Sequence, residues 1–375
     1  MFELSEQAEI SVITCGPDQK ELYSAFGHSA FRVYDPAHGI DEAYNYGVFD
    51  FDQPNFYLNF ARGYSYYKLG VMEYPRFKYI YEYYNRFIHE QKLNLTTTEK
   101  DSLYAFLRWN AQPENQSYLY DYFYDNCATK IRDVVVLVFG DNVQFDDTHV
   151  TTDYTIRDLT DLYLQYQPWG DLAIDICLGL PMDKKATPYE YMFLPDYIER
   201  GFDNATILRD GNQLPLVKEK IEVYKNRPEE ITYTYPHPWI IFGFLFLIVS
   251  FVSFRDWNKK ILSNWLDVIL LTTTGLLGLL LLLLWVGTNH QAAAKNFNLI
   301  WALPTHLIVG ILLLIKKKKK WMKQYFLIAH LITLLLLFSW IFLPQPIHPF
   351  LLPVVAALSV RFIVNYRIRR ISPFN

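Results

Sequence analysis

The sequence predicts an α+β domain over residues 1–235, followed by an all-α transmembrane domain of about five helices over residues 236–375. Composition supports this division, because the first part is polar and rich in tyrosine whereas long apolar runs dominate after Pro236. Periodicity supports it as well, because segments alternating with a period of two are mixed with helical segments in the first part. The 375 residues are enough for two domains.

Strand patterns open the first domain. We predict a strand over residues 9–15. Residues 27–35 and 43–51 then alternate between apolar and polar side chains, with a turn sequence between them. These two segments should pair as an antiparallel hairpin in which His28 lies opposite residues 45–48. Asn45 would then lie within reach of the His28 imidazole.

Helical patterns follow the hairpin. Thr96 and Glu99 form a capping-box sequence, which satisfies free backbone N–H groups at a helix start. A polar turn before Cys127 marks the start of another helix. Helices are expected over residues 55–62, 74–91 and 96–110, from Cys127 onward, and at several places within 140–174, with a short strand over 93–95 and an irregular stretch over 178–195.

The second domain contains five apolar stretches near the length that crosses about 30 Å of hydrocarbon. The last of them carries Arg361 and fits a span least well. The predicted spans are residues 238–254, 264–287, 297–315, 325–343 and 349–366.

The loops between these stretches alternate in charge, which predicts the orientation. Loops 288–296 and 344–349 hold only one basic residue, Lys295. The other connections are basic: residues 255–260, Lys316–Lys320 with Lys323, and Arg367, Arg369 and Arg370. Because basic loops stay in the cytoplasm, the first domain should lie outside and the C-terminus inside. Residues 1–5 carry no leader, so we expect a cleaved signal peptide to be missing from this numbering.

Cys127 is a candidate nucleophile. Asp125 or Asn126 is a good N-cap, so Cys127 should lie in the first turn of a helix. There, free backbone N–H groups and the helix dipole favour a thiolate over a thiol. Two other interpretations stay open: Cys127 could be a small buried residue, or it could form a disulfide with Cys15. Three cysteines are too few for a framework of several disulfides, but they allow one pair.

His28 is the candidate base. It follows Gly27 at the start of a predicted strand, about a hundred residues before Cys127. A histidine on a strand and a cysteine at a helix start form the site of papain-like enzymes, in which the cysteine usually comes first. Here the order is reversed. The alternative for His28 is a hydrogen-bonded histidine of the core.

This order resembles the circularly permuted papain-like folds of the lecithin:retinol acyltransferase type. Residues from about 10 to 195 more closely resemble the bacterial Lnb N-terminal periplasmic domain family, and the membrane half is similar to that family around His290 and residues 296–304. The blocks that carry the resemblance are Thr14-Cys15, residues 23–29 (YSAFGHS), 44–51 (YNYGVFDF), 55–57 (NFY), 124–129 (YDNCAT) and 186–195 (ATPYEYMFLP).

The resemblance implies an inner-membrane lipoprotein N-acyltransferase of the Bacteroidota type. Such an enzyme moves a fatty acyl chain from a membrane phospholipid to the α-amino group of a diacylated lipoprotein. On this model Cys127 forms an acyl thioester, His28 is the general base, and the Cys127 N–H binds the oxyanion. Asn45 would hold the imidazole, or else be a turn residue at the strand end.

Further residues are expected to contact substrate or support the catalytic pair. Those close to the site in sequence are Ser29, Tyr44, Tyr46, Asp125 and Asn126. His290 and Trp301 should lie at the external membrane surface, where they would bind lipid head groups, although Trp301 also fits an interfacial anchor. Cys15 and Cys177 are expected to be packed residues.

Other functions are less well supported. The net charge of −4 gives no indication of a nucleic-acid partner, and no residue set has metal-ligand spacing or suggests a cofactor. A periplasmic Cys peptidase or amidase acting on the cell wall would use the same Cys127 and His28, but would need only one membrane anchor. A receptor or scaffold with a structural Cys127 is the third reading, and would tolerate Cys127→Ser.

Overall fold

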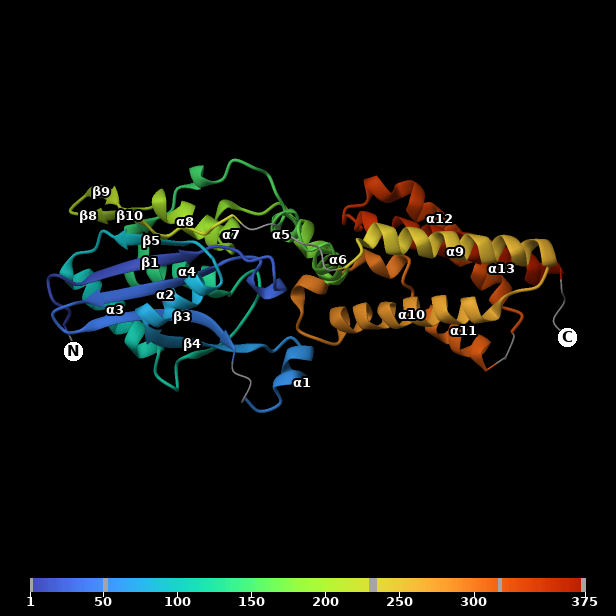
Figure 1. The fold of residues 1–375 in the computed structure, drawn as a ribbon, viewed down its shortest axis with the longest axis horizontal. Coiled ribbons are helices and arrows are strands. Elements are labelled where there is room, and N and C mark those ends of the chain that lie inside the picture. Colours follow the sequence, from blue (N-terminus) through green and yellow to red (C-terminus); the bar gives the residue numbers. More distant parts are fainter. Residues whose placement is uncertain (1–2, 50–52, 229–234, 316–318, 372–375) are drawn as a thin grey trace. The chain divides into compact units, whose positions relative to one another are not determined.

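The computed structural model describes residues 3–49, 53–228, 235–315 and 319–371. The chain forms two compact units (Figure 1). The first unit comprises Met1–Tyr166 and Lys185–Ile231, and the second comprises Gln167–Lys184 and Thr232–Asn375. Residues 167–184, which the sequence analysis placed in the first domain, therefore cluster with the membrane helices.

A seven-stranded sheet forms the centre of the first unit, with the strand order β10-β5-β1-β2-β3-β4-β6. Every neighbouring pair in it is antiparallel. Its strands are β1 (Glu9–Cys15), β2 (His28–Asp35), β3 (Ile40–Phe49), β4 (Tyr66–Glu73), β5 (Ile88–Leu93), β6 (Ser117–Leu119) and β10 (Val217–Tyr224). A small second sheet holds β7 (Val143–Gln144), β8 (Thr206–Arg209) and β9 (Asn212–Pro215).

Helices cover both faces of the large sheet (Figure 1). Residues of α3, α4 and α8 pack on one face, and α2 packs on the other. The helices of this unit are α1 (Phe56–Ala61), α2 (Tyr74–Tyr83), α3 (Thr97–Asn110), α4 (Cys127–Phe139), α5 (Ile156–Leu164), α7 (Pro188–Tyr191) and α8 (Pro195–Asp203), with short 3₁₀ turns η1 (Leu22–Ser24), η2 (Gly140–Asn142) and η3 (Asp147–His149).

The predicted hairpin is confirmed: β2 and β3 are antiparallel, with Phe31 opposite Tyr44. The capping box at Thr96 is also present and begins α3. The helix predicted over residues 74–91 was too long, because α2 ends at Tyr83 and β5 begins at Ile88. Asn85 has a φ of 54°, which ends the helical path, and β5 is then held between β1 and β10 by pairing that is distant in sequence.

Four helices of the second unit are long and apolar enough to cross a membrane among the described residues, and a fifth apolar helix, α11, is shorter. The α-helices of this unit are α6 (Pro168–Cys177), α9 (Pro238–Lys259), α10 (Asn264–Val286), α11 (Thr305–Leu314), α12 (Met322–Ser339) and α13 (Leu352–Ile371). Its 3₁₀ turns are η4 (Leu180–Asp183), η5 (Gln291–Ala293), η6 (Phe297–Ile300), η7 (Trp340–Phe342) and η8 (Pro349–Leu351).

The stretch 297–315 is not one long helix, which corrects the prediction. It holds η6 and then α11, whose 10 residues span only about 15 Å. The part before α11 is a folded loop, because Asn296 and Asn298 bind the Ile176 carbonyl at the end of α6. Pro304 comes directly before α11. Further contacts hold the same region, since Gln345 donates to the Leu178 carbonyl over 3.1 Å.

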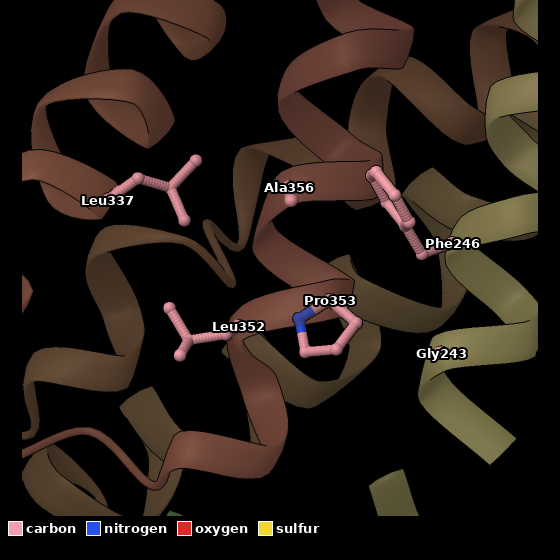
Figure 2. A pocket seen from close by; sticks show the side chains of 6 residues that line it. All are labelled: Gly243, Phe246, Leu337, Leu352, Pro353 and Ala356. Atoms are coloured by element: carbon pink, nitrogen blue, oxygen red, sulfur yellow. The ribbon is translucent and has the colours of Figure 1, made fainter. Parts of the chain in front are cut away.

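Helices α9, α12 and α13 leave a hydrophobic hollow of about 310 Å³ (Figure 2). Its lining is Gly243 and Phe246 from α9, Leu337 from α12, and Leu352, Pro353 and Ala356 from α13. Hydrocarbon alone lines it, which suits the interior of a bilayer.

A buried ionic network links three helices of the second unit. Arg361 of α13 donates through Nε to Asp267 of α10 over 2.6 Å and through Nη1 to Asp256 of α9 over 2.8 Å. All three residues are about 1% exposed. Asn365 adds a hydrogen bond of 2.7 Å to Asp267. The arginine that fitted a membrane span poorly is thus paired inside the bundle, as buried charges require.

Arg361→Ala should destabilise the second unit, because it leaves two buried carboxylates without their cation. We expect a loss of about 3–5 kcal/mol in the free energy of unfolding. Denaturant unfolding of the full chain in detergent measures it. Arg367→Ala is the matched control, since Arg367 lies on the same helix but is exposed, and it should change stability by less than about 1 kcal/mol. Equal effects of both variants would contradict the role of the network.

Candidate active site

The start of α4 is built around the side chain of Asn126, which is 6% exposed. Its Oδ1 accepts from the backbone N–H groups of Ala128 over 2.8 Å and Thr129 over 2.9 Å, as expected of an N-cap. Its Nδ2 donates to the carbonyls of Tyr122 and Phe193, each over 2.8 Å. All hydrogen-bonding groups of this side chain are therefore used to fix the helix start.

Cys127 is the first residue of α4. It is half-buried, and its thiol is free, as are those of Cys15 and Cys177. Its backbone N–H precedes the first helical hydrogen bond and contacts no acceptor among the described residues. A thiol and an unused donor thus lie side by side at the positive end of a helix.

His28 begins β2 and lies on the same sheet face as Asn45 of β3. The alternation of side chains along each strand accounts for this, because the core residues Ala30 and Ala43 face the same way. The His28 Nε2 and the Asn45 Oδ1 are 2.5 Å apart. If Asn45 accepts this hydrogen bond, the imidazole carries its proton on Nε2, and Nδ1 is left for the thiol.

A bulge in β3 lets Cys127 approach the hairpin. Pairing with β4 shifts register between Asn45 and Val48. Gly47 lies in this bulge with a φ of 84°, a conformation that residues with a side chain rarely adopt. A Cβ atom at position 47 would lie 3.4 Å from the Cys127 Cβ and 3.5 Å from the Tyr120 ring. These are ordinary van der Waals distances, so the backbone conformation rather than lack of space calls for glycine here.

The Cys127 thiol is acidified by its surroundings. Burial alone would raise its pKa, but the charge of His28 and a hydrogen bond to His28 lower it. Hydrogen bonds from the backbone N–H groups of Ser29 and Ala128 lower it further. The net result is a pKa below the ordinary value of a cysteine. This arrangement favours a thiolate paired with an imidazolium, the reactive form of a cysteine nucleophile.

The surroundings of the thiol are aromatic. The Tyr81 ring stacks near His28, with ring centres 6.1 Å apart. Burial raises the pKa values of Tyr81, Tyr118 and Tyr120, and the negative charge of Cys127 raises them further. The three hydroxyls therefore stay protonated and can donate hydrogen bonds near the thiolate. Cys15 lies opposite His28 on β1, and its pKa is also raised by burial, so its thiol stays protonated.

The other residues predicted to lie near the site differ in where their side chains point and what they contact. Ser29 is fully buried and offers its backbone N–H to the thiol. Tyr44 and Tyr46 face the opposite side of the sheet, where their hydroxyls donate to Glu42 over 2.9 Å and to Asn110 over 2.6 Å. Asp125 forms an ion pair with Lys130 over 2.7 Å. Of these, Ser29 and Asn126 contact the Cys127 region directly, whereas the two tyrosine side chains belong to the core.

His290 and Trp301 belong to the second unit. The His290 Nδ1 lies 2.8 Å from the Thr288 hydroxyl. Trp301 is only 2% exposed, and its indole N–H donates to Asn298 over 2.9 Å. In this conformation Trp301 offers no surface to a lipid head group.

Sequence reasoning missed Gly47, Tyr81, Tyr120 and the contact of Asn126 with Phe193. Neighbouring side chains on a strand face opposite ways. This alternation could have predicted that Tyr44 and Tyr46 face away from Asn45 and the site. No group of three or more His, Cys, Asp or Glu that could hold a metal ion occurs in the described part of the chain.

Two family models match the chain. The Lnb N-terminal periplasmic domain matches residues 5–161, and the Lnb transmembrane domain matches residues 229–371. The chain belongs to the Lnb family. Comparison with curated proteins and with solved structures finds no match. Membership indicates a membrane enzyme with a periplasmic domain, in agreement with the apolar helices of the second unit.

The lowered pKa of Cys127 predicts how its alkylation by iodoacetamide depends on pH. The thiolate fraction rises as pH increases through the pKa, so the wild-type rate should reach its midpoint below that of a free cysteine. His28→Ala should move the midpoint to higher pH, because burial remains while the compensating cation is lost. Peptide mass spectrometry measures the rate at Cys127.

His89→Ala is the matched control, since His89 also lies on a strand of the sheet but pairs with Glu199. It should leave the Cys127 midpoint unchanged. A His28→Ala midpoint equal to that of the wild type would show that His28 does not stabilise the thiolate.

Proposed function

We propose that this chain is a lipoprotein N-acyltransferase, which moves a fatty acyl chain from a membrane phospholipid to the N-terminal α-amino group of a diacylated lipoprotein. The observation that carries the proposal is the acidified Cys127 thiol beside His28, whose Nε2 is held by Asn45, in an Lnb family membrane protein. Acyl transfer through a thioester requires such a nucleophile and base.

In the first half-reaction the Cys127 thiolate attacks the ester carbonyl carbon of the phospholipid. The negative charge that develops on the carbonyl oxygen is stabilised by the unused Cys127 N–H. When the intermediate collapses, the carbon–oxygen bond breaks and the His28 imidazolium gives its proton to the leaving lysophospholipid alkoxide. The products are an acyl thioester on Cys127 and a neutral imidazole.

In the second half-reaction the lipoprotein amine attacks the thioester carbonyl. His28 now accepts a proton from the amine, with Nδ1 as the base. Collapse of the intermediate expels the Cys127 thiolate and releases the amide product. The thiolate–imidazolium pair is thereby restored. Asn45, by accepting from Nε2, keeps the ring in the orientation that both steps need.

The membrane unit supports this function over wall hydrolysis, because both substrates are lipids and a hydrolase would need a single anchor. We infer that basic loops face the cytoplasm and that the C-terminus lies there too. This orientation needs an odd number of crossings, so we infer that the short helix α11 adds a fifth to the four long helices. Of the basic run between α11 and α12, Lys316–Lys318 lie outside the described residues.

Mass spectrometry of a lipoprotein reporter tests the proposal, in cells that lack their own N-acyltransferase. Wild type should add an acyl mass to the reporter N-terminus. Cys127→Ala should abolish it, because no thioester forms, and His28→Ala should slow it by about 10²–10⁴-fold. Cys177→Ala and His89→Ala are matched controls outside the site and should retain activity.

Absence of N-acylation by well-expressed wild type would contradict the proposal. Acylation that survives Cys127→Ala would remove Cys127 as the nucleophile.

A further inference from the structure

The segment between β3 and β4 exposes an unusual amount of apolar surface. Helix α1 has six residues, and none of them is buried in the described structure. Tyr57 is 82% exposed and Leu58 56%. We define the α1 patch as the exposed side chains Tyr57, Leu58, Phe60, Tyr64, Tyr66 and Leu119. Leu119 belongs to it because it lies directly opposite Tyr66 in the sheet.

The protein itself provides little that would keep α1 helical. Isolated helices shorter than about 12 residues are marginal in water, and helices in proteins are stabilised mainly by packing one face. Here no residue of the helix is buried in the described structure, and the N-cap Asn55 has a φ of 58° and forms no capping hydrogen bond. Contact with an apolar surface outside the protein would supply the missing stabilisation.

The composition of the patch indicates what that surface is. All six of its side chains are aromatic or aliphatic, and the nearest basic residues along the chain are Arg62 and Lys68, while Asp50 and Asp52 precede Gln53. Tyrosine and phenylalanine beside basic residues are typical of segments that lie in the head-group region of a bilayer. The second unit ties the domain covalently to a membrane, and the chain passes between the units three times. A bilayer is therefore always near.

The α1 patch is also continuous with the candidate active site. β3 carries Asn45 and Gly47, and it leads into this segment. The Ser65 carbonyl, between Tyr64 and Tyr66, accepts a hydrogen bond of 2.8 Å from the Tyr120 N–H. Tyr120 in turn lies beside Gly47 and feels the charge of Cys127. The backbone of the patch is thus joined to a residue beside the nucleophile.

We propose that the α1 patch inserts into the outer leaflet of the membrane and passes the phospholipid acyl ester to Cys127. The insertion itself depends only on the membrane location, whereas the transfer of lipid rests on the proposed acyltransferase function. The patch would be the lipid-contacting surface of the domain. Tyr57 and Leu58 enter the bilayer, and Arg62 stays at the level of the phosphates.

Helix α2 provides a matched comparison. Tyr83 on α2 is 70% exposed, so its exposure resembles that of Tyr57. Unlike α1, α2 buries Tyr74, Phe77 and Tyr81, and it carries both signs of charge, with Lys78 paired to Glu82. It therefore needs no external surface.

Fluorescence quenching by lipids tests the insertion. The full chain, with a coumarin amino acid at position 57 or at position 83, is placed in nanodiscs of phosphatidylethanolamine and phosphatidylglycerol. Replacing part of the lipid with a brominated phosphatidylcholine should quench the probe at 57 and leave that at 83 unchanged. Equal quenching at both positions, or none at 57, would overturn the proposal. This readout does not depend on catalysis.

A second measurement tests the transfer. Tyr57→Asp combined with Leu58→Asp should lower acylation of the reporter by about tenfold or more, because charged side chains oppose insertion. The same protein should react normally with a soluble short-chain thiol-reactive ester, which needs no bilayer. Tyr79→Asp with Tyr83→Asp is the control and should transfer at the wild-type rate. Undiminished transfer by the α1 variant would overturn the role of the patch, whereas inactive wild type would count against the acyltransferase function alone.

Discussion

The buried side chain of Asn126 determines where Cys127 lies, and the rest of the site depends on that position. It binds two N–H groups of α4 and the carbonyls of Tyr122 and Phe193. Any shift of the helix start would leave buried polar groups unpaired, which is costly. Cys127 is therefore held against the bulge at Gly47. His28 and Asn45 lie on one face of the hairpin near this bulge.

A buried charge needs a partner that compensates for its lost hydration, and both units of the chain follow this rule. In the first unit, a thiolate is tolerated in a partly buried place because His28 and two backbone N–H groups compensate for its lost hydration. In the second, Asp256 and Asp267 are tolerated because Arg361 lies between them. One pairing provides reactivity and the other joins three helices.

Local patterns in the sequence predicted the hairpin, a helix cap at Asp125 or Asn126, and the nearness of His28 to Asn45, because each depends on residues close in sequence or on a single turn. Features that depend on distant contacts were missed. α2 gives way to β5 because β1 and β10 pair with it, and residues 167–184 join the second unit through Asn296 and Gln345. The same contacts shortened the third predicted span. The core positions of Tyr44 and Tyr46 were also missed, although they follow from the local alternation of side chains along β3.

Trapping the acyl-enzyme would test the central claim most directly. Purified full-length protein in phospholipid nanodiscs, without a lipoprotein acceptor, is quenched in acid and digested for mass spectrometry. The account predicts one acyl mass on the peptide that contains Cys127, and its loss on treatment with neutral hydroxylamine, which cleaves thioesters. An acyl group on another residue, such as Cys15, with none on the Cys127 peptide, would contradict the account.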